Sequence, residues 1–168
     1  LGTVTKRCTK MPGVITCSGS SAPSGTTSLT WAMVHLAAVA MIGPYLKKRG
    51  GRVVVVNKST VPISMIQHTK ELFRRQGADN IGIVSNPEFL VEGRAIQGSI
   101  RPDRVIVGAE DPRDFVVMRN LYSRFCDSTA VKYLEVNPYE AEAGKLLANW
   151  LLFNKVVTTY DVVGRLCE

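Results

Sequence analysis

The sequence predicts an α/β fold in which the strands of an open, parallel sheet alternate with helices, followed by one long helix. Three observations support this prediction. Short segments rich in valine and isoleucine alternate with longer segments of helical character along most of the chain. Residues 53–56 are an unbroken run of valines, which is typical of a strand covered on both faces in a parallel sheet. Residues 139–167 contain no proline, which predicts a helix that reaches beyond a small domain.

The expected elements follow one another as strand and helix. Residues 14–17 are a β-prone run that leads into a loop rich in serine and glycine, and Ser28 is a suitable N-cap for a helix over residues 29–48. That helix closes with basic residues and two glycines, and its apolar sequence predicts burial. Further strands are expected at 52–57, 81–84, 104–107 and 131–136, further helices at 63–76, 111–125 and 139–167, and a loop with a short helix at 86–97.

This order divides the chain into three regions. Residues 1–12 are polar and without periodicity, and we expect a poorly defined leader there. Residues 13–137 hold the alternating strands and helices, whose parallel neighbours require right-handed crossovers. Residues 138–168 hold the long helix, which we expect to connect the sheet to another part of the protein or to a second copy.

Composition and hydropathy limit the class of protein. Of the 168 residues, 45% are hydrophobic and 21% are charged, which excludes an intrinsically disordered chain. The longest apolar stretch, residues 31–46, is shorter than the roughly 20 residues of a membrane span and contains His35 and Gly43-Pro44. We therefore expect no membrane span, no secretory signal and a cytoplasmic location.

Charges and cysteines narrow the possible ligands. The formal net charge is +7, and residues 1–50 contain six basic residues and no acidic ones. This excess suits an anionic partner such as nucleotide phosphates or nucleic acid, or else forms a solvated basic face. Because no aromatic residues are interleaved with the basic ones, nucleic-acid binding is the least favoured of these. The four cysteines are scattered without CxxC spacing, so we expect reduced, mostly packed thiols and no metal site.

Polar motifs follow two of the expected strands. Open parallel sheets bind ligands beyond the carboxyl ends of their strands, where loops and helix amino termini present free N–H groups. Lys-Ser-Thr-Val-Pro at 58–62 offers hydroxyl groups to a phosphate, a ribose or a catalytic water, or else caps the next helix. Residues 86–93 follow the next strand. If they are locally helical, Glu88 and Glu92 share a face, one as a base and one as a ligand for a hydroxyl group; otherwise they are two solvated acids.

A third motif, Glu142, Lys145 and Asn149, lies on the long helix. Lys145 and Asn149 are one turn apart, so an ammonium and an amide on the same side of the helix can stabilise a developing oxyanion together. Taken alone, Lys145 is more readily interpreted as a surface residue. The apolar residues 146–148 beside it are consistent with partial burial.

The order of the motifs along the chain is similar to that in a known protein family. Asn-Lys-Ser-Thr-Val-Pro at 57–62, Ser-Asn-Pro-Glu-Phe-Leu-Val-Glu-Gly at 85–93, Arg-Pro-Asp-Arg-Val-Ile-Val-Gly at 101–108 and Ala141-Glu142 with Lys145 and Asn149 follow in turn. This series resembles the UDP-glucose 6-dehydrogenases of the UDP-glucose/GDP-mannose dehydrogenase family. GDP-mannose dehydrogenases share the first two motifs, whereas Pro-Asp-Arg-Val is more similar to the UDP-glucose enzymes. The resemblance implies an incomplete Rossmann-like parallel sheet, the second half of an NAD-binding domain, followed by a long connecting helix.

The resemblance also implies a reaction, the oxidation of UDP-glucose to UDP-glucuronate by two NAD⁺ in turn, through a thioester on a cysteine. The implied catalytic residues are Glu88 as base, Thr60 as its assistant, and Lys145 and Asn149 as oxyanion stabilisers. Residues implied to bind NAD are Ser59, Thr60, Val61 and Glu92, and those implied to bind the UDP-sugar are Phe89, Leu90, Glu92, Lys145 and Asn149. A homodimer is expected, formed through the long helix or an exposed sheet edge.

The sequence departs from the family pattern at two functional segments. It contains neither the GxGxxG turn that receives the pyrophosphate of NAD nor the Gly-Gly-Ser-Cys-Phe-Pro-Lys-Asp segment of the nucleophile. Residues 18–21 and 63–65 also differ from the Val-Gly-Thr sequences usual in the family. We therefore predict that this chain alone is inactive and binds NAD weakly. The alternative is a non-catalytic α/β module that dimerises or binds nucleotides weakly.

Overall fold

The computed structural model describes residues 14–17, 28–49, 51–91, 93–126 and 131–167. The expected leader at residues 1–12, the loop at 18–21 and Glu92 lie outside these residues. The strands are β1 (Val14–Cys17), β2 (Val53–Asn57), β3 (Ile81–Ser85), β4 (Arg104–Gly108) and β5 (Lys132–Val136). The helices are α1 (Ser28–Lys48), α2 (Met65–Arg75), α3 (Ala95–Ile100), α4 (Pro112–Cys126), α5 (Pro138–Val157), the π-helical η1 (Thr158–Val163) and α6 (Gly164–Leu166). The predicted order of strands and helices is therefore confirmed.

The sheet has the strand order β1-β2-β3-β4-β5 and consists of two parallel parts. Strands β1, β2 and β3 pair in parallel, and so do β4 and β5. A single antiparallel bridge between Ser85 and Gly108 joins the two parts. The predicted Rossmann-like α/β class is thus confirmed, with one antiparallel bridge in an otherwise parallel sheet. Among the described residues between β3 and β4, the only helix is the six-residue α3, so no longer crossover helix brings β4 back parallel to β3.

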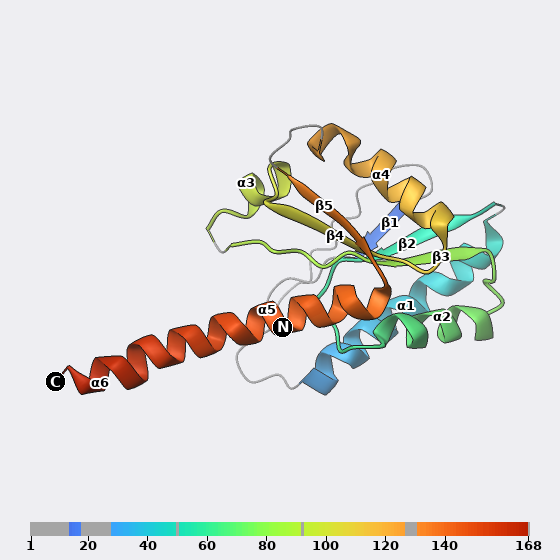
Figure 1. Cartoon of the computed structure of the whole chain (residues 1–168). Coiled ribbons are helices and arrows are strands. Elements are labelled where there is room, and N and C mark those ends of the chain that lie inside the picture. Colours follow the sequence, from blue (N-terminus) through green and yellow to red (C-terminus); the bar gives the residue numbers. More distant parts are fainter. Residues whose placement is uncertain (1–13, 18–27, 50, 92, 127–130, 168) are drawn as a thin grey trace.

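Helices cover both faces of the sheet, α1 and α2 on one side and α4 on the other (Figure 1). The four valines of β2 are between 0% and 3% exposed and alternate between two cores. Val53 and Val55 pack in the cluster with Phe73 of α2, while Val54 and Val56 pack in the cluster with Met118 of α4. Burial on both faces explains the unbroken valine run, since each valine so buried contributes roughly 1.5–3 kcal/mol.

Helix α1 is buried on one face only, and the expectation that it is buried throughout is wrong. Met33 and Tyr45 are 71% and 75% exposed, although Val39 is buried. The helix also continues through Pro44. Proline lacks the N–H that would bond the carbonyl of Ala40, and the side chain of Gln76 donates to that carbonyl instead, at 3.0 Å.

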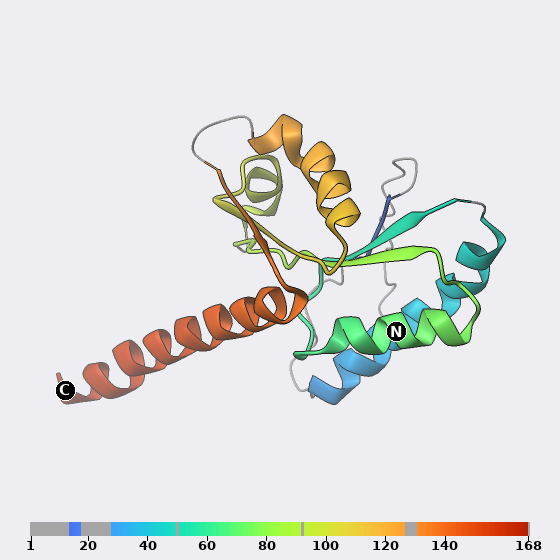
Figure 2. The same ribbon diagram turned by 45° about the vertical axis from the view of Figure 1, so that its right-hand side comes forward.

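Helix α5 begins in the domain and then leaves it, as Figures 1 and 2 show from two directions. Asn137 and Glu140 form a capping box at its start, which fixes where the helix begins. Pro138, Ala141 and Glu142 are buried against the domain, whereas most residues from Leu147 onward are exposed. The predicted long helix is confirmed, with a π-helical segment near its end. Among the described helices, none has the length and apolarity needed to cross a membrane.

Candidate functional site

The first two polar motifs meet at the carboxyl ends of neighbouring strands. Asn57 and Ser85, the last residues of β2 and β3, are partners in the sheet register. The backbone N–H of Asn86 then donates to the carbonyl of Asn57 at 2.8 Å, which continues the pairing by one residue. The motifs at 58–62 and 86–93 therefore begin side by side, because parallel strands deliver their loops to the same edge.

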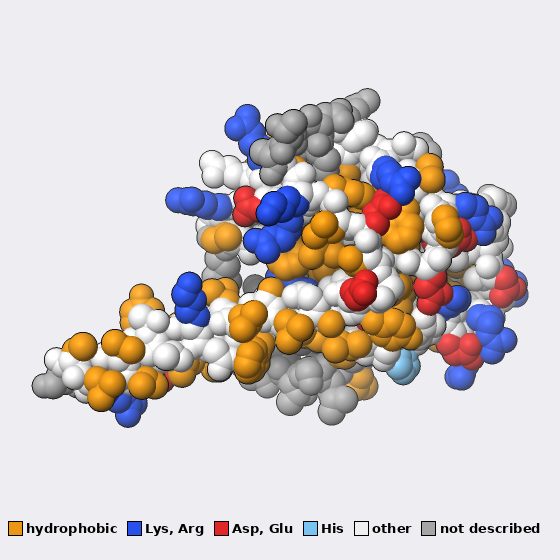
Figure 3. All heavy atoms as spheres, viewed as in Figure 1, with side chains coloured by type: hydrophobic (Ala, Val, Ile, Leu, Met, Phe, Trp, Pro, Cys, Tyr) orange, Lys and Arg blue, Asp and Glu red, His pale blue; other side chains and the backbone are white. Residues whose placement is uncertain are grey.

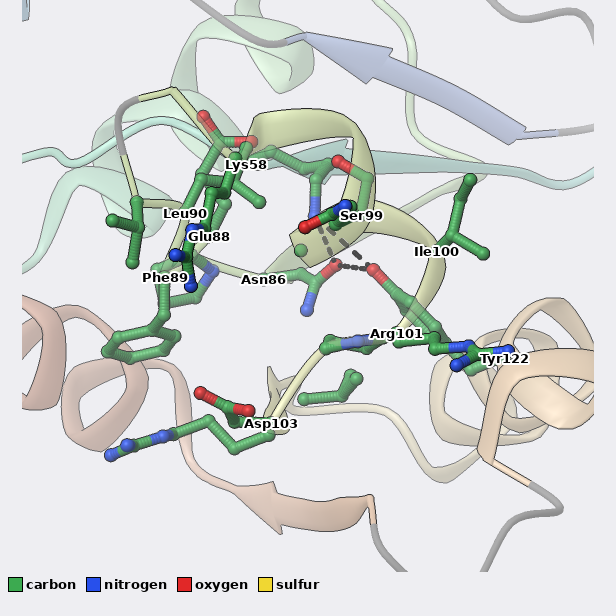
Figure 4. A pocket seen from close by; sticks show the side chains of 18 residues that line it. Lys58, Asn86, Glu88, Phe89, Leu90, Ser99, Ile100, Arg101, Asp103 and Tyr122 are labelled. Carbon is green, nitrogen blue, oxygen red and sulfur yellow. Dashed lines mark hydrogen bonds between the residues drawn. The ribbon is translucent and has the colours of Figure 1, made fainter.

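Asn86 joins the two parts of the sheet at this edge. Its side-chain amide donates to the carbonyl of Ile106 in β4 at 2.8 Å. Its Oδ1 accepts hydrogen bonds from the ammonium of Lys58 at 3.2 Å and from the hydroxyl of Tyr122 at 2.6 Å. Asn86 is only 2% exposed, so these bonds satisfy polar groups that water barely reaches. Figure 4 shows Lys58, Asn86 and Tyr122 converging.

A cavity of about 790 Å³ opens beside this junction. Glu88, Phe89 and Leu90 line it, and so does Lys58, which comes from the other motif (Figure 4). Arg94, Arg101, Asp103, Arg104 and Tyr122 are among the remaining lining residues. The structure thus brings three of the predicted substrate and catalytic residues together in one hollow at the carboxyl ends of β2 and β3.

The loop that carries Glu88 is irregular from Asn86 to Val91. The helical spacing that would place Glu88 and Glu92 on one face is therefore not formed over these residues. Proline at position 87 favours this extended start, because it disfavours helical conformation in the residue before it. Glu88 itself is half-buried and lines the cavity.

Lys145 reaches this loop from α5. Its ammonium lies 4.8 Å from the centre of the Phe89 ring, and the guanidinium carbon of Arg104 lies 5.5 Å from the same centre. Both distances suit cation–π contacts. Partial burial lowers the pKa of Lys145, and the negative charge of Glu88 opposes this shift. Lys145 is thus half-buried against the Phe89 ring, in agreement with the partial burial expected from residues 146–148.

The other predicted residues lie outside the cavity. Asn149, one turn beyond Lys145, is exposed. In the motif after β2, Thr60 is exposed and Val61 is buried, while the backbone N–H of Ser59 donates to the side chain of Asn57 at 3.1 Å. None of these four residues lines the cavity around Glu88.

Glu142 has a role that its sequence position did not reveal. Its carboxylate accepts hydrogen bonds from the backbone N–H groups of Ser64, at 2.7 Å, and Ile66, at 3.0 Å, at the start of α2. Burial raises the pKa of this carboxyl group, and the backbone hydrogen bonds oppose the rise. Glu142 of α5 therefore caps α2, in place of the expected cap from Ser59 or Thr60. It also supports Ser64 in its left-handed conformation, with φ of 76°.

Several contributors to the site were not predicted. Asn86 belonged to a quoted motif, but nothing local showed that its amide joins two parts of the sheet. Tyr122 and Arg94 lie in segments whose patterns indicate only a helix and a loop. Among the described residues, no group of histidine, cysteine and acidic side chains could hold a metal ion. The thiol of Cys167 is free and exposed, so this one of the four expected reduced, mostly packed cysteines is not packed.

The sequence of this chain matches a known protein family and its members. Residues 19–126 match the model of the NAD-binding domain of the UDP-glucose/GDP-mannose dehydrogenase family. The UDP-glucose 6-dehydrogenase of Pseudomonas aeruginosa is 35% identical over 136 residues, which cover 77% of this chain and 29% of that enzyme. The chain thus spans less than a third of that relative.

Two solved structures agree with this match. A UDP-glucose dehydrogenase from Pyrobaculum islandicum superposes with a TM-score of 0.68 and 30% identity, over 75% of this chain and 29% of that one. A GDP-mannose dehydrogenase from Pseudomonas aeruginosa gives a TM-score of 0.73 over 86% of this chain and 33% of that one, but at 22% identity it shows a shared fold alone. The chain belongs to the UDP-glucose/GDP-mannose dehydrogenase family, and its matched residues are part of the NAD-binding domain.

Proposed function

We propose that this chain is part of a UDP-glucose 6-dehydrogenase, which oxidises UDP-glucose to UDP-glucuronate with two NAD⁺. The observation that carries the proposal is the meeting of motifs distant in sequence: Glu88 lines the cavity, and Lys145 from α5 contacts the ring of Phe89 next to it. Such a carboxylate and ammonium suit proton removal from an alcohol and stabilisation of the oxygen that becomes negative. The division into a partial dinucleotide-binding domain at 13–137 and a connecting helix at 138–168 belongs to the same proposal.

In this mechanism the residues of the chain bind, orient and move protons. Glu88 accepts a proton from the substrate hydroxyl or from a water, with Thr60 assisting. Lys145 and Asn149 donate hydrogen bonds to the developing oxyanion, and the half-burial of Lys145 strengthens its effect because water screens it less. Phe89, Leu90 and Glu92 contact the sugar nucleotide.

The residues of this chain would form only part of a binding site for NAD. Thr60 is exposed directly after β2, where Ser59, Thr60, Val61 and Glu92 would contact the nicotinamide half of NAD. When bound, NAD⁺ accepts hydride from the substrate. No GxGxxG turn is present for the pyrophosphate, and the family's cysteine segment is also absent from this sequence. We therefore propose that the chain alone binds NAD⁺ weakly and does not turn over.

A chimera tests the assignment. The matching segment of the Pseudomonas aeruginosa UDP-glucose 6-dehydrogenase is replaced by this chain, and NADH formation is measured with UDP-glucose and with GDP-mannose. We expect activity with UDP-glucose, reduced at least about 100-fold in kcat by Glu88→Gln. Glu110→Gln, an exposed acid outside the cavity, is the matched control and should retain activity. A folded chimera without activity on either substrate would show the proposal to be wrong.

We also propose that the chain forms a homodimer through α5. Large apolar side chains remain exposed along this helix, including Leu147, Trp150, Leu151, Phe153 and Val156. Figure 3 shows hydrophobic side chains along much of the protruding helix. Association would remove this apolar surface from water. Light scattering should report a dimer, and Trp150→Glu together with Leu151→Glu should shift it toward the monomer; a monomeric parent chain at high concentration would contradict the proposal.

The alternative function is a non-catalytic module that dimerises or binds nucleotides weakly. The departure of residues 63–65 from the Val-Gly-Thr sequence usual in the family favours it. The chimera separates the two functions, because a module that has lost catalytic geometry would not support turnover even with both missing segments supplied. For either function we propose a cytoplasmic location.

A further inference from the structure

We infer that Tyr122 of α4 is a positioning residue for the proposed oxidation, because its hydroxyl fixes Asn86 and thereby the start of the loop that carries Glu88. The resemblance gives neither Tyr122 nor Asn86 a role. The inference rests on the proposed function, in which Glu88 removes a proton. It adds the means by which helix α4, which contains none of the proposed catalytic residues, holds that base in place.

The first step concerns the chain between Asn86 and Glu88. Residues 86–91 belong to no helix or strand, so no regular ladder of hydrogen bonds sets the direction of Glu88. Asn86 is buried, and its backbone N–H continues the pairing with β2 at 2.8 Å. Only Pro87, whose ring fixes φ, separates Asn86 from Glu88. An anchor at Asn86 therefore limits where the carboxylate of Glu88 can lie.

The side chain of Asn86 is held in one orientation by partners from three segments of the chain. Its Nδ2 donates to the carbonyl of Ile106 in β4 at 2.8 Å, while its Oδ1 accepts from Tyr122 at 2.6 Å and from Lys58 at 3.2 Å. The ammonium of Lys58 also donates to the hydroxyl oxygen of Tyr122 at 3.3 Å, which leaves the O–H to point at Asn86. A flipped amide would place Nδ2 against two donors, so the network selects one orientation.

Tyr122 supplies the shortest of these contacts, and the core fixes its own place. Its ring packs against the buried cluster that contains Met118. The centre of the ring lies 6.3 Å from that of Tyr133 in β5, at an interplanar angle of 58°, which suits an aromatic pair. The hydroxyl of a packed ring has little freedom, so it holds Asn86 more firmly than the long, flexible side chain of Lys58 can.

Loss of the hydroxyl should act on Glu88 more than on the fold as a whole. Phenylalanine keeps the ring in the core, and Lys58 still reaches Asn86, so we expect Tyr122→Phe to fold. With its firmest partner lost, Asn86 holds the loop less tightly. Because a displacement of about 1 Å can reduce a rate about 100-fold, we expect this partial loosening to reduce kcat about tenfold.

Coupling to Glu88 distinguishes positioning from general destabilisation. In the chimera with the Pseudomonas aeruginosa enzyme, kcat for UDP-glucose is compared between the parent and Tyr122→Phe, each with and without Glu88→Gln. The loss of about tenfold should shrink to less than about twofold when Glu88→Gln is present, because a base that is absent cannot be misplaced. Equal losses in the two backgrounds would overturn the inference, and so would an unchanged kcat in Tyr122→Phe.

Tyr133→Phe is the matched control for this comparison. It removes the hydroxyl of the ring beside Tyr122, and Tyr133 is not among the residues that line the cavity. We expect kcat to remain within about twofold of the parent, with or without Glu88→Gln. A loss in Tyr133→Phe equal to that in Tyr122→Phe would show a general effect of the aromatic pair and would overturn the inference.

The isolated chain gives a second measurement that needs no activity. Backbone amide relaxation measured by NMR should show lower order parameters at Glu88 and Phe89 in Tyr122→Phe than in the parent chain, and unchanged values in Tyr133→Phe. Unchanged values in Tyr122→Phe would overturn the inference even where the parent chimera is active. An inactive parent chimera, combined with a loosened loop in Tyr122→Phe, would contradict the proposed function and leave the anchoring of the loop supported.

Discussion

A basic residue flanks each end of strand β2, and the two differ in the charge of their partners. At the amino end, Arg52 pairs with Asp111 at 3.1 Å and with Asp114, both near the start of α4. At the carboxyl end, the partners of Lys58 among the described residues are the neutral side chains of Asn86 and Tyr122. Helix α4 supplies Asp114 at one end and the hydroxyl of Tyr122 at the other, and Asp111 directly precedes it. The cation at the amino end is thus neutralised by carboxylates, whereas the one at the carboxyl end is bound by neutral polar groups.

The first prediction tests the neutralised end and has the largest expected effect. Asp114 is buried, and Gly82 leaves room for it, because a Cβ at Gly82 would clash with Oδ1 of Asp114. Asp114→Ala should lower the free energy of unfolding by about 3 kcal/mol, since it removes the buried partner of Arg52 and leaves that half-buried cation only the more exposed Asp111. Urea denaturation measures this loss. Arg113→Gln, which alters only an exposed cation, should cost less than about 1 kcal/mol.

Glu142 provides the next test, at the start of the helix that follows β2. Glu142→Ala removes the acceptor for the N–H groups of Ser64 and Ile66, and should cost about 2–3 kcal/mol in unfolding free energy. Hydrogen exchange should accelerate at these two amides more than at the amides of β4. Uniform acceleration across the sheet would indicate general destabilisation in place of a lost cap.

Lys58→Met tests the carboxyl end of β2 and should change the free energy of unfolding by less than about 1 kcal/mol. The variant loses two hydrogen bonds to the ammonium but no longer holds a partly desolvated cation. Urea denaturation at the same pH as for Asp114→Ala gives the comparison. A loss as large as that of Asp114→Ala would mean that both ends of β2 serve mainly to stabilise the fold.

The smallest expected effect is a pH dependence at the amino end. Hydrogen bonds from Arg113 hold the pKa of Asp111 below its usual value of 3.8. With a lowered folded-state pKa, Asp111 stabilises the fold above its usual pKa, and this contribution is lost as the pH falls through the folded-state value. Thermal melts from about pH 5 to about pH 2 should therefore show a shallower acid decline for Asp111→Asn than for the parent chain. Parallel declines would contradict this role.

Much of the fold was predictable because its signals are local. The valine run of β2 requires burial on both faces, which the two cores on either side of it confirm. The start of α5 at Asn137-Pro138 was predictable because the residues that cap the helix are close together in the sequence. The motif around Glu88 follows its strand, so its place at the carboxyl edge could also be expected from the sequence.

Only the tertiary structure decided how distant groups meet. Neither hydrophobic periodicity nor a motif shows that β4 pairs with β3 in the antiparallel direction, because pairing direction depends on the path of the chain between strands. The hydrogen bonds of Asn86, the contact of Lys145 with Phe89 and the capping by Glu142 likewise join residues that no local pattern relates. By itself the sequence determined the elements and their order, since these depend on neighbouring residues. The tertiary structure decided which charges are paired and which face the cavity, since electrostatic and hydrogen-bond partners depend on distance in space.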